Sequence, residues 1–390
     1  MSGHPSQSPG VYLEQASSEL APGLQTGVPA FIGTLRETAT GAQQSLSLDL
    51  PAWAYLEQRH GTAWAEGLLG YAVRGFFENG GQRCYVLPLG ASGLEGALDE
   101  LSRLDGVDLV CAPGLEAADS AARTAAQARI LQACSERGDC FAILDSPLCT
   151  GTSAQILDQV KAYRDTLDAA IKAFAGGNSG ALYFPWLEVP AGDGRVLVPP
   201  CGHIAGVYSR VDGNSGFHKA PANEALEGVS NLQVALSSAG QETLASGGGP
   251  AINCLRAFTG RGMRIWGART LSRDPAWCHV NVRRTVLTIR RWLELVMSSM
   301  VFEPNDLKLW IRIGREVGAF LEELHRRGAL KGAVAEEAFY VKCDAETNPQ
   351  QVRELGQVVT EIGLAPVTPS EFLVVRLVQS ADGVALAGAA

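Results

Sequence analysis

The sequence predicts a mixed α/β protein with more than one domain. Between residues 84 and 186, short apolar strands alternate with amphipathic helical segments, a pattern typical of parallel α/β units. A pair of long helices follows, over residues 276–301 and 306–327. The length of 390 residues leaves room for two or three domains, each with its own core.

The composition excludes several classes of protein. Apolar residues make up 46% of the chain and charged residues 19%, which is typical of a globular protein. The formal net charge of −9 disfavours nucleic acid and anionic membranes as partners. No run of about 20 uninterrupted apolar residues occurs, so we expect no membrane insertion, and the N-terminal residues do not resemble a signal peptide. The nine cysteines form no CxxC pair and predict buried, reduced thiols of a cytoplasmic fold.

The first half of the chain is predicted from apolar runs and helix-end signals. Residues 28–35 (VPAFIGTL) are typical of a buried strand. A helical pattern over residues 64–77 ends at Asn79-Gly80-Gly81. The expected strands after it cover residues 84–89, 107–111, 140–144 and 181–186, and the expected helices lie near residues 94–104, 117–134 and 154–174.

The second half begins after a Gly and Pro cluster at Gly247–Pro250, a plausible domain boundary. A strand over residues 252–258 precedes the two long helices. Asp274-Pro275 supplies a cap and a first helical residue for the first of them. The expected elements that close the chain are a strand at 339–342, a short helix at 349–355 and a strand at 371–378 that is apolar on both faces.

The search for catalytic chemistry finds little. The sequence holds none of the common phosphate-binding, zinc-protease or serine-hydrolase motifs, and its six histidines are scattered. Asp145 follows the strand at 140–144, at the end of the sheet where α/β proteins build ligand sites. Asp-Ser-Pro is also good turn chemistry, which we favour. We therefore predict no enzyme, no catalytic residue, no cofactor and no metal; the alternative is a hydrolase-like or transferase-like enzyme that uses Asp145.

The first long helix carries a cluster of four arginines. Its apolar residues form one narrow stripe, and on a helical wheel Arg284 and Arg291 lie opposite that stripe, flanked by Arg283 and Arg290. One interpretation is an ordinary solvated face. The other is a docking surface for an acidic partner.

Two strands lack an obvious partner in the sequence. A short extended segment near the N-terminus stands alone between flexible stretches and cannot fold by itself. The apolar strand at the other end lacks a local partner as well. Strand addition to another sheet would satisfy their backbone groups. The residues concerned are Val11, Tyr12 and Leu13, and Phe372, Leu373, Val374, Val375, Arg376, Leu377 and Val378.

Several separated motifs resemble one family. They are SPGVY, GVPAFIG, FFENGG, HKAPAN, INCLRAFTGRGMRIWGARTL and NVRR, at residues 8–12, 27–33, 76–81, 218–223, 252–271 and 281–284. Together they resemble the tail sheath proteins of contractile phage tails and related contractile injection systems. The combination of the HKAPAN and WGART motifs is the most specific part of this resemblance.

The resemblance implies a structural subunit without an active site. Such subunits polymerise as a helical sheath around an inner tube, contract, and drive the tube through a target envelope. Terminal arms exchange strands between neighbours. The implied partners are further copies of the chain, the inner tube protein, and baseplate and cap proteins at the two ends, with assembly in the bacterial cytoplasm. The resemblance also implies that four arginines contact the inner tube: Arg283, Arg284, Arg290 and Arg291. A baseplate or tail-tube component is a third hypothesis, although tube proteins are much shorter.

The expected domain organisation combines both arguments. Residues 1–17 form an N-terminal arm, and residues 18–90 with 250–370 form a discontinuous inner domain that faces the tube. Residues 91–249 form an inserted outer α/β domain. Residues 371–390 form a C-terminal arm strand and tail.

Overall fold

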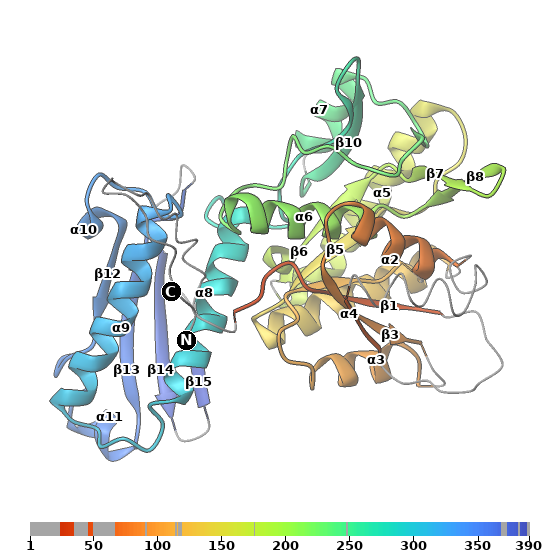
Figure 1. Cartoon of the computed structure of the whole chain (residues 1–390). Coiled ribbons are helices and arrows are strands. Elements are labelled where there is room, and N and C mark those ends of the chain that lie inside the picture. The colour runs from red at the N-terminus through yellow and green to blue at the C-terminus, as the bar shows by residue number, and fades with distance from the viewer. Residues whose placement is uncertain are drawn as a thin grey trace, which may run out of the picture.

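The computed structural model describes residues 24–34, 67–89, 92–113, 115, 119–174, 176–244 and 249–367, and the backbone alone of residues 46–49, 245–246, 373–380 and 383–387. Figure 1 shows two lobes joined by a long helix, α8 (Val280–Ser298). The α/β lobe comprises the elements before this helix, from β1 to β11. The C-terminal lobe comprises those after it, from α9 to β15.

The α/β lobe is built on a sheet of eight strands. From one edge to the other they are β11 (Gly262–Trp266), β10 (Ile252–Phe258), β6 (Gly180–Phe184), β5 (Phe141–Asp145), β4 (Leu109–Cys111), β1 (Pro29–Gly33), β3 (Arg83–Pro88) and β2 (Leu46–Asp49). The pairs from β10 to β3 are parallel, and the two edge strands are antiparallel to their neighbours. The predicted parallel α/β unit is therefore confirmed.

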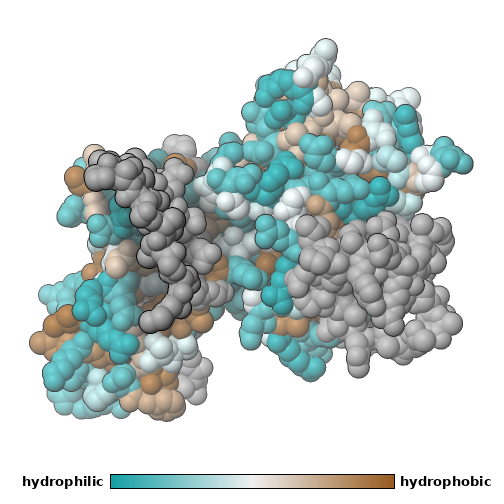
Figure 2. Space-filling view, in the orientation of Figure 1, coloured by the Kyte–Doolittle hydropathy of each residue, from teal (hydrophilic) through white to brown (hydrophobic). Residues whose placement is uncertain are grey.

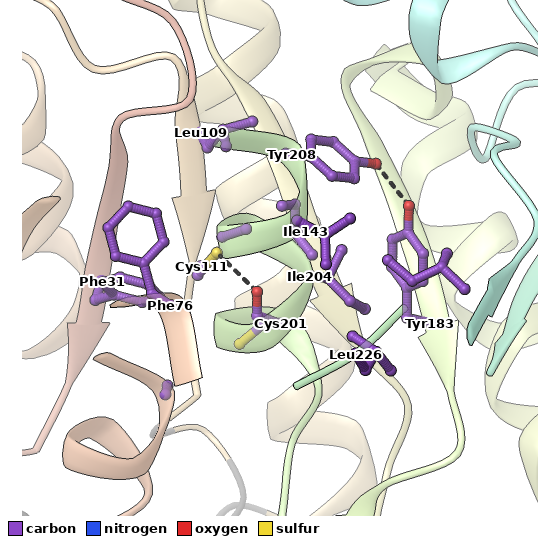
Figure 3. Packing of buried hydrophobic residues seen from close by; sticks show 14 of the residues in the cluster. Phe31, Phe76, Leu109, Cys111, Ile143, Tyr183, Cys201, Ile204, Tyr208 and Leu226 are labelled. Carbon is purple, nitrogen blue, oxygen red and sulfur yellow. Dashed lines mark hydrogen bonds between the residues drawn. The ribbon is translucent and has the colours of Figure 1, made fainter. Parts of the chain in front are cut away.

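Helices cover both faces of this sheet. They are α2 (Leu68–Glu78), α3 (Gly93–Leu101), α4 (Ser120–Arg137), α5 (Ser153–Ile171), α6 (Cys201–Ser215) and α7 (Ser238–Ser246), with 3₁₀ turns η1 (Lys172–Phe174) and η2 (Gly176–Ser179). Alternate residues of the strands point to opposite faces, so Phe31 packs with α2 and α6 while Ile32 joins the core below α3, α4 and α5. Figure 3 shows the first of these cores, where Phe31 lies against Phe76 and the hydroxyls of Tyr183 and Tyr208 are 2.6 Å apart.

The contact between α2 and α6 depends on a glycine. A Cβ on Gly202 would lie 2.2 Å from the carbonyl oxygen of Ala72, so only glycine lets the two helices come this close. A small antiparallel sheet lies beside them and was not predicted. Its strands are β8 (Gly194–Val198), β7 (Leu187–Ala191) and β9 (Asn231–Leu232).

The C-terminal lobe packs helices on a four-stranded antiparallel sheet. Its strands, in spatial order, are β12 (Phe339–Lys342), β13 (Val358–Leu364), β14 (Leu373–Ser380) and β15 (Gly383–Ala387). Its helices are α9 (Leu307–Arg326), α10 (Ala335–Ala338) and α11 (Gln350–Glu354). Asp306 caps α9 by accepting hydrogen bonds from the backbone N–H of Lys308 and Leu309. The rings of Trp292 and Phe320 stack at 3.7 Å and fix α8 against α9.

Two sequence predictions are corrected by this arrangement. Helix α8 begins at Val280, not near residue 276, because Asp274 closes a turn instead: its carboxylate accepts from the N–H of Ala276 and its carbonyl from that of Trp277. The strand that we expected to lack a local partner, β14, pairs with β13 and β15 of the same chain. Residues 11–13 lie outside the described residues.

The predicted inner and outer domains are not separate units of the fold. Strands β1 and β3 come from the predicted inner domain and β4 to β6 from the predicted outer domain, yet all five lie in one sheet. The assignment of these residues to inner and outer parts of an assembly stays a prediction.

Candidate functional site

The arginine cluster of α8 lies at the junction of the two lobes. Arg284 is 2% exposed and donates through Nη1 (2.8 Å) and Nη2 (2.5 Å) to the carboxylate of Asp212 on α6. Nη2 also lies 3.2 Å from Oδ2 of Asp108. The guanidinium stands over the ring of Tyr208, 4.8 Å from its centroid. Burial alone would lower the pKa of Arg284, but the two carboxylates outweigh it and raise that pKa, so the side chain stays charged.

Asp108 connects this ion pair to the start of the first strand. Its carboxylate accepts from the backbone N–H of Gly27 at 3.0 Å and of Val28 at 2.6 Å. Arg291 lies about two helical turns after Arg284 on α8. Its Nη2 is 3.8 Å from the same carboxylate of Asp108. One buried acid thus joins the segment that enters β1, the residue before β4, and helix α8.

The other two arginines also face the α/β lobe. The guanidinium of Arg290 lies over Gly138, the left-handed residue that ends α4, and a Cβ there would be 1.8 Å from Nη1. The carbonyl end of a helix attracts cations. Arg290 also donates to Glu294 at 2.7 Å. The guanidinium of Arg283 is 5.3 Å from the centroid of the Trp277 ring. Burial and the nearby cation Arg290 lower the pKa of Arg283 to about 10.

The prediction that Arg284 and Arg291 point outward was therefore wrong. It assumed that α8 buries a single stripe. In the structure Ile289 and Leu293 pack into the C-terminal lobe while Leu287 joins the core of the α/β lobe, so both sides of the helix are covered. The inner-tube contact that we assigned to Arg283, Arg284, Arg290 and Arg291 stays a prediction, and their burial weighs against it.

Asp145 has a structural role in this geometry. Its carboxylate accepts from the backbone N–H of Cys201 at 2.8 Å, at the first residue of α6, and its carbonyl accepts from the side chain of Gln127. Burial raises the pKa of Asp145 to about 7. A carboxyl at a helix N-terminus is a favourable cap.

The described residues hold no metal-binding cluster, that is, no group of three or more His, Cys, Asp or Glu side chains arranged to bind an ion. All nine cysteines are free thiols, and seven of them are buried. None of the helices in the described ranges is long and apolar enough to cross a membrane.

Most of the exposed large apolar side chains belong to α8 and the C-terminal lobe. Among the described residues, the large apolar side chains that are exposed are Leu148, Leu295, Phe302, Leu307, Ile311, Val334, Tyr340, Leu355 and Val367. All but the first follow the start of α8. Exposed apolar clusters of this kind mark interaction surfaces.

Four of these side chains form what we call the end patch: Phe302, Leu307, Ile311 and Leu355. Phe302 is 96% exposed and adopts a left-handed backbone (φ 72°), which non-glycine residues seldom do. Asn305 holds this turn against the segment after α11 by donating to the carbonyl of Gln357 at 2.9 Å. Figure 2 shows hydrophobic surface exposed at the lower end of the C-terminal lobe.

Charged residues of both signs surround the end patch. The acids include Glu303 and Glu316, which lie 3.9 Å and 3.1 Å from Arg312. The cations are Lys308, Arg312 and Arg315 on α9 and Arg353 on α11, and all four are exposed. Sequence reasoning missed this surface because it concentrated on the arginines of α8. The signal was present: Leu307 and Ile311 are apolar but lie outside the buried stripe of α9.

Comparisons with known proteins define the class. Residues 90–271 match the phage tail sheath protein central domain, and residues 272–380 match the phage tail sheath C-terminal domain. The chain is 25% identical over 244 residues to the tail sheath protein of Salmonella phage ViI, a match that covers 62% of this chain and 37% of that relative. The chain thus spans well under half the length of that curated relative.

Two solved structures are similar over almost their whole length. The PVC sheath complex of an extracellular contractile injection system, in its contracted state, superposes with a TM-score of 0.73 and 28% identity, over 95% of this chain and 97% of that one. The contracted helical sheath of the anti-feeding prophage gives a TM-score of 0.71 and 28% identity, over 95% and 98%. The chain belongs to the phage tail sheath protein family. Its relatives are structural proteins, and the enzyme alternative at Asp145 finds no support.

Proposed function

We propose that this chain is the sheath subunit of a phage tail or tail-like particle, which polymerises helically around an inner tube and contracts to drive the tube through a target envelope. The observation that carries the proposal is the match of both sheath domains, supported by a fold shared with two contracted sheaths. The exposed apolar surface of the C-terminal lobe supports it as well, since a subunit of a polymer needs such contacts.

The end patch is the surface that we propose to grip the inner tube. It offers exposed apolar side chains beside Lys308 and Arg315, which form no ion pair with a described residue, whereas the arginines of α8 are committed to contacts within the subunit. Exposed charges give a contact that is selective but only moderately strong, which suits a tube that must be released. Baseplate and cap proteins at the two ends, and assembly in the bacterial cytoplasm, belong to the same proposal.

We propose strand exchange as the link between neighbouring subunits. Strands β12 and β15 stand at the two edges of the C-terminal sheet, so each can take a further strand. In the lattice, residues 11–13 would supply a strand to the sheet of a neighbour, and residues 372–378 would do so by exchanging their own pairing with β13 for pairing with β13 of another copy. Head-to-tail contacts of this kind need not close and therefore build helices.

Charge reversal on α9 tests the tube contact. Lys308→Glu with Arg315→Glu should leave the subunit folded, because both side chains are exposed, and should lower the yield of tube-filled sheaths on co-expression with the tube protein. The matched control is Arg103→Glu with Arg195→Glu, two exposed positions of the α/β lobe. Equal yields of tube-filled sheaths from both pairs, counted by negative-stain electron microscopy, would refute the assignment of the end patch.

A further inference from the structure

A large cavity opens beside the N-terminus of α8. Its volume is about 860 Å³, within the range of protein binding sites. Ser215 from the end of α6, Trp266 from β11 and Val367 beyond β13 all line it, so the wall includes residues from both lobes. Two of the motifs of the sequence, HKAPAN and WGART, meet at this cavity, and no step of the proposed contraction uses it.

The walls of the cavity are held by asparagines. Asn253 accepts from the N–H of Arg269 at 2.7 Å and donates to its carbonyl at 2.7 Å, which fixes the turn after β11. Asn281, in the first turn of α8, donates to the carbonyl of His218 at 3.0 Å. Because these buried amides have their partners, the cavity is a preformed feature of the fold.

The lining carries positive charge. Lys219 and Arg269, exposed at the cavity, carry this charge; burial lowers the pKa of His218 and of His279 beside them, which favours their neutral forms. None of the described residues that line it is Asp or Glu, although acids outnumber bases in the chain. Lys219 lies 2.8 Å from Glu224, whereas Arg269 makes no ion pair with any described residue. The first turn of α8, which contains no acid, adds its positive end to the same space. The cavity therefore favours a ligand that carries carboxylates.

The C-terminal lobe presents a matching element at α10. Residues 333–337 form an exposed corner, which we call the acidic corner, at the end of the lobe far from the α/β lobe (Figure 1). Val334 is 51% exposed, and Glu336 and Glu337 beside it are exposed as well. The corner thus joins an apolar side chain to two carboxylates, and the cavity joins the ring of Trp266 to cations.

We propose that the cavity of one subunit receives the acidic corner of a neighbouring copy. This inference rests on the proposed function, because it requires a polymer of this chain. The two surfaces lie at different places on the subunit, so their contact is heterologous and extends from copy to copy without closing. Glu336 would pair with Arg269, and Val334 would lie against Trp266.

A photo-crosslinking experiment tests the contact in assembled sheaths. The crosslinking residue benzoylphenylalanine replaces Ala220, which lines the cavity, and ¹⁵N-labelled and unlabelled subunits are mixed so that mass spectrometry distinguishes links between copies. We expect links to residues 333–337 of another copy. The control places the same residue at Ser102, which is exposed on the α/β lobe.

A charge swap sharpens the test. Arg269→Glu and Glu336→Arg should each lower the crosslink yield about tenfold, and the double variant should recover most of it, because the pair is restored with its signs exchanged. Arg103→Glu serves as a control with the same change of net charge as Arg269→Glu. Folding is checked by thermal melts.

The outcomes distinguish a failure of this contact from a failure of the proposed sheath function. Sheaths whose cavity crosslinks elsewhere, or a double variant no better than the singles, would overturn this inference and leave the sheath function standing. A chain that forms no polymer with its tube protein would overturn both.

Discussion

At the scale of single residues, burial decides what each charged group does. Arg284, Asp108 and Asp212 form a buried network in which each charge has a partner. Such a network contributes little net stability when intact but is costly to break, because a lone buried charge remains. From the sequence we predicted Arg284 and Arg291 on an exposed face, where charge reversal would leave the fold intact; in the buried network it would not.

Removal of the central cation tests that network. Arg284→Met should lower the free energy of unfolding by about 3–5 kcal/mol, because it leaves the carboxylate of Asp212 buried without its cation and leaves Asp108 with the more distant Arg291. Arg315→Met on the exposed side of α9 should change it by less than about 0.5 kcal/mol. Urea unfolding followed by circular dichroism measures both; equal effects would contradict the buried network.

Two buried groups give the protein opposing responses to pH. His203 is buried, its Nδ1 has no hydrogen-bond partner, and burial, with the nearby cation Arg74, lowers its pKa to about 4. Between pH 6.5 and pH 4 the imidazole of His203 therefore binds a proton in the unfolded chain but not in the folded chain. As a result, the stability of the fold falls as the pH falls. Asp145, with its pKa raised to about 7, binds a proton more readily when folded, so its contribution rises as the pH falls from 7 toward 3.8.

Each contribution can be isolated by comparison with a variant. Between pH 7 and 5, His203→Gln should gain about 2 kcal/mol relative to the wild type, because it no longer carries the histidine penalty. Asp145→Asn should lose stability relative to the wild type over the same interval. Differences that do not change with pH, in urea titrations at several pH values, would show that these groups titrate normally in the folded protein.

At the scale of elements, periodicity predicted most helices and strands but not their neighbours. The strand and helix alternation from residue 84 to residue 186 and the buried stripe of α9 were read correctly from the sequence. The start of α8 was not, because Asp274-Pro275 serves equally well in a turn. The burial of the arginines on α8 could not be predicted, since Asp108 and Asp212 lie 176 and 72 residues away in sequence.

The close contact between α2 and α6 can be tested by substitution of its glycine. Gly202→Ala should destabilise the protein by about 1–3 kcal/mol, since the new methyl group would press on the backbone of Ala72. Gly213→Ala on the same helix meets no atom within 4 Å and should be neutral or slightly stabilising. Thermal unfolding of the two variants compares them; a greater loss at Gly213 would contradict the close packing.

At the scale of the whole molecule, the two lobes differ in how much apolar surface they expose. The α/β lobe is covered on both faces of its sheet, whereas α8 and the C-terminal lobe carry all but one of the large apolar side chains that are exposed among the described residues. The family was recognisable from separated sequence motifs such as HKAPAN and WGART, which can be read without knowing the fold. The surfaces that meet partners were not, because exposure depends on how distant segments pack.

The proposed N-terminal arm, residues 1–17, can be tested by deletion. Deletion of residues 1–17 should leave a folded subunit that forms no linked lattice, because the proposed strand to a neighbour is lost. Size-exclusion chromatography and electron microscopy follow the loss of the polymer. Normal sheaths from the truncated chain would contradict strand exchange through the N-terminal arm.

The most direct test of the central claim is electron microscopy of the chain co-expressed with its tube protein. We predict striated helical sheaths around a tube, in a long narrow form and in a shorter, wider form without the tube gripped along its length. Only single particles or closed rings, under conditions in which the tube protein polymerises, would contradict the account.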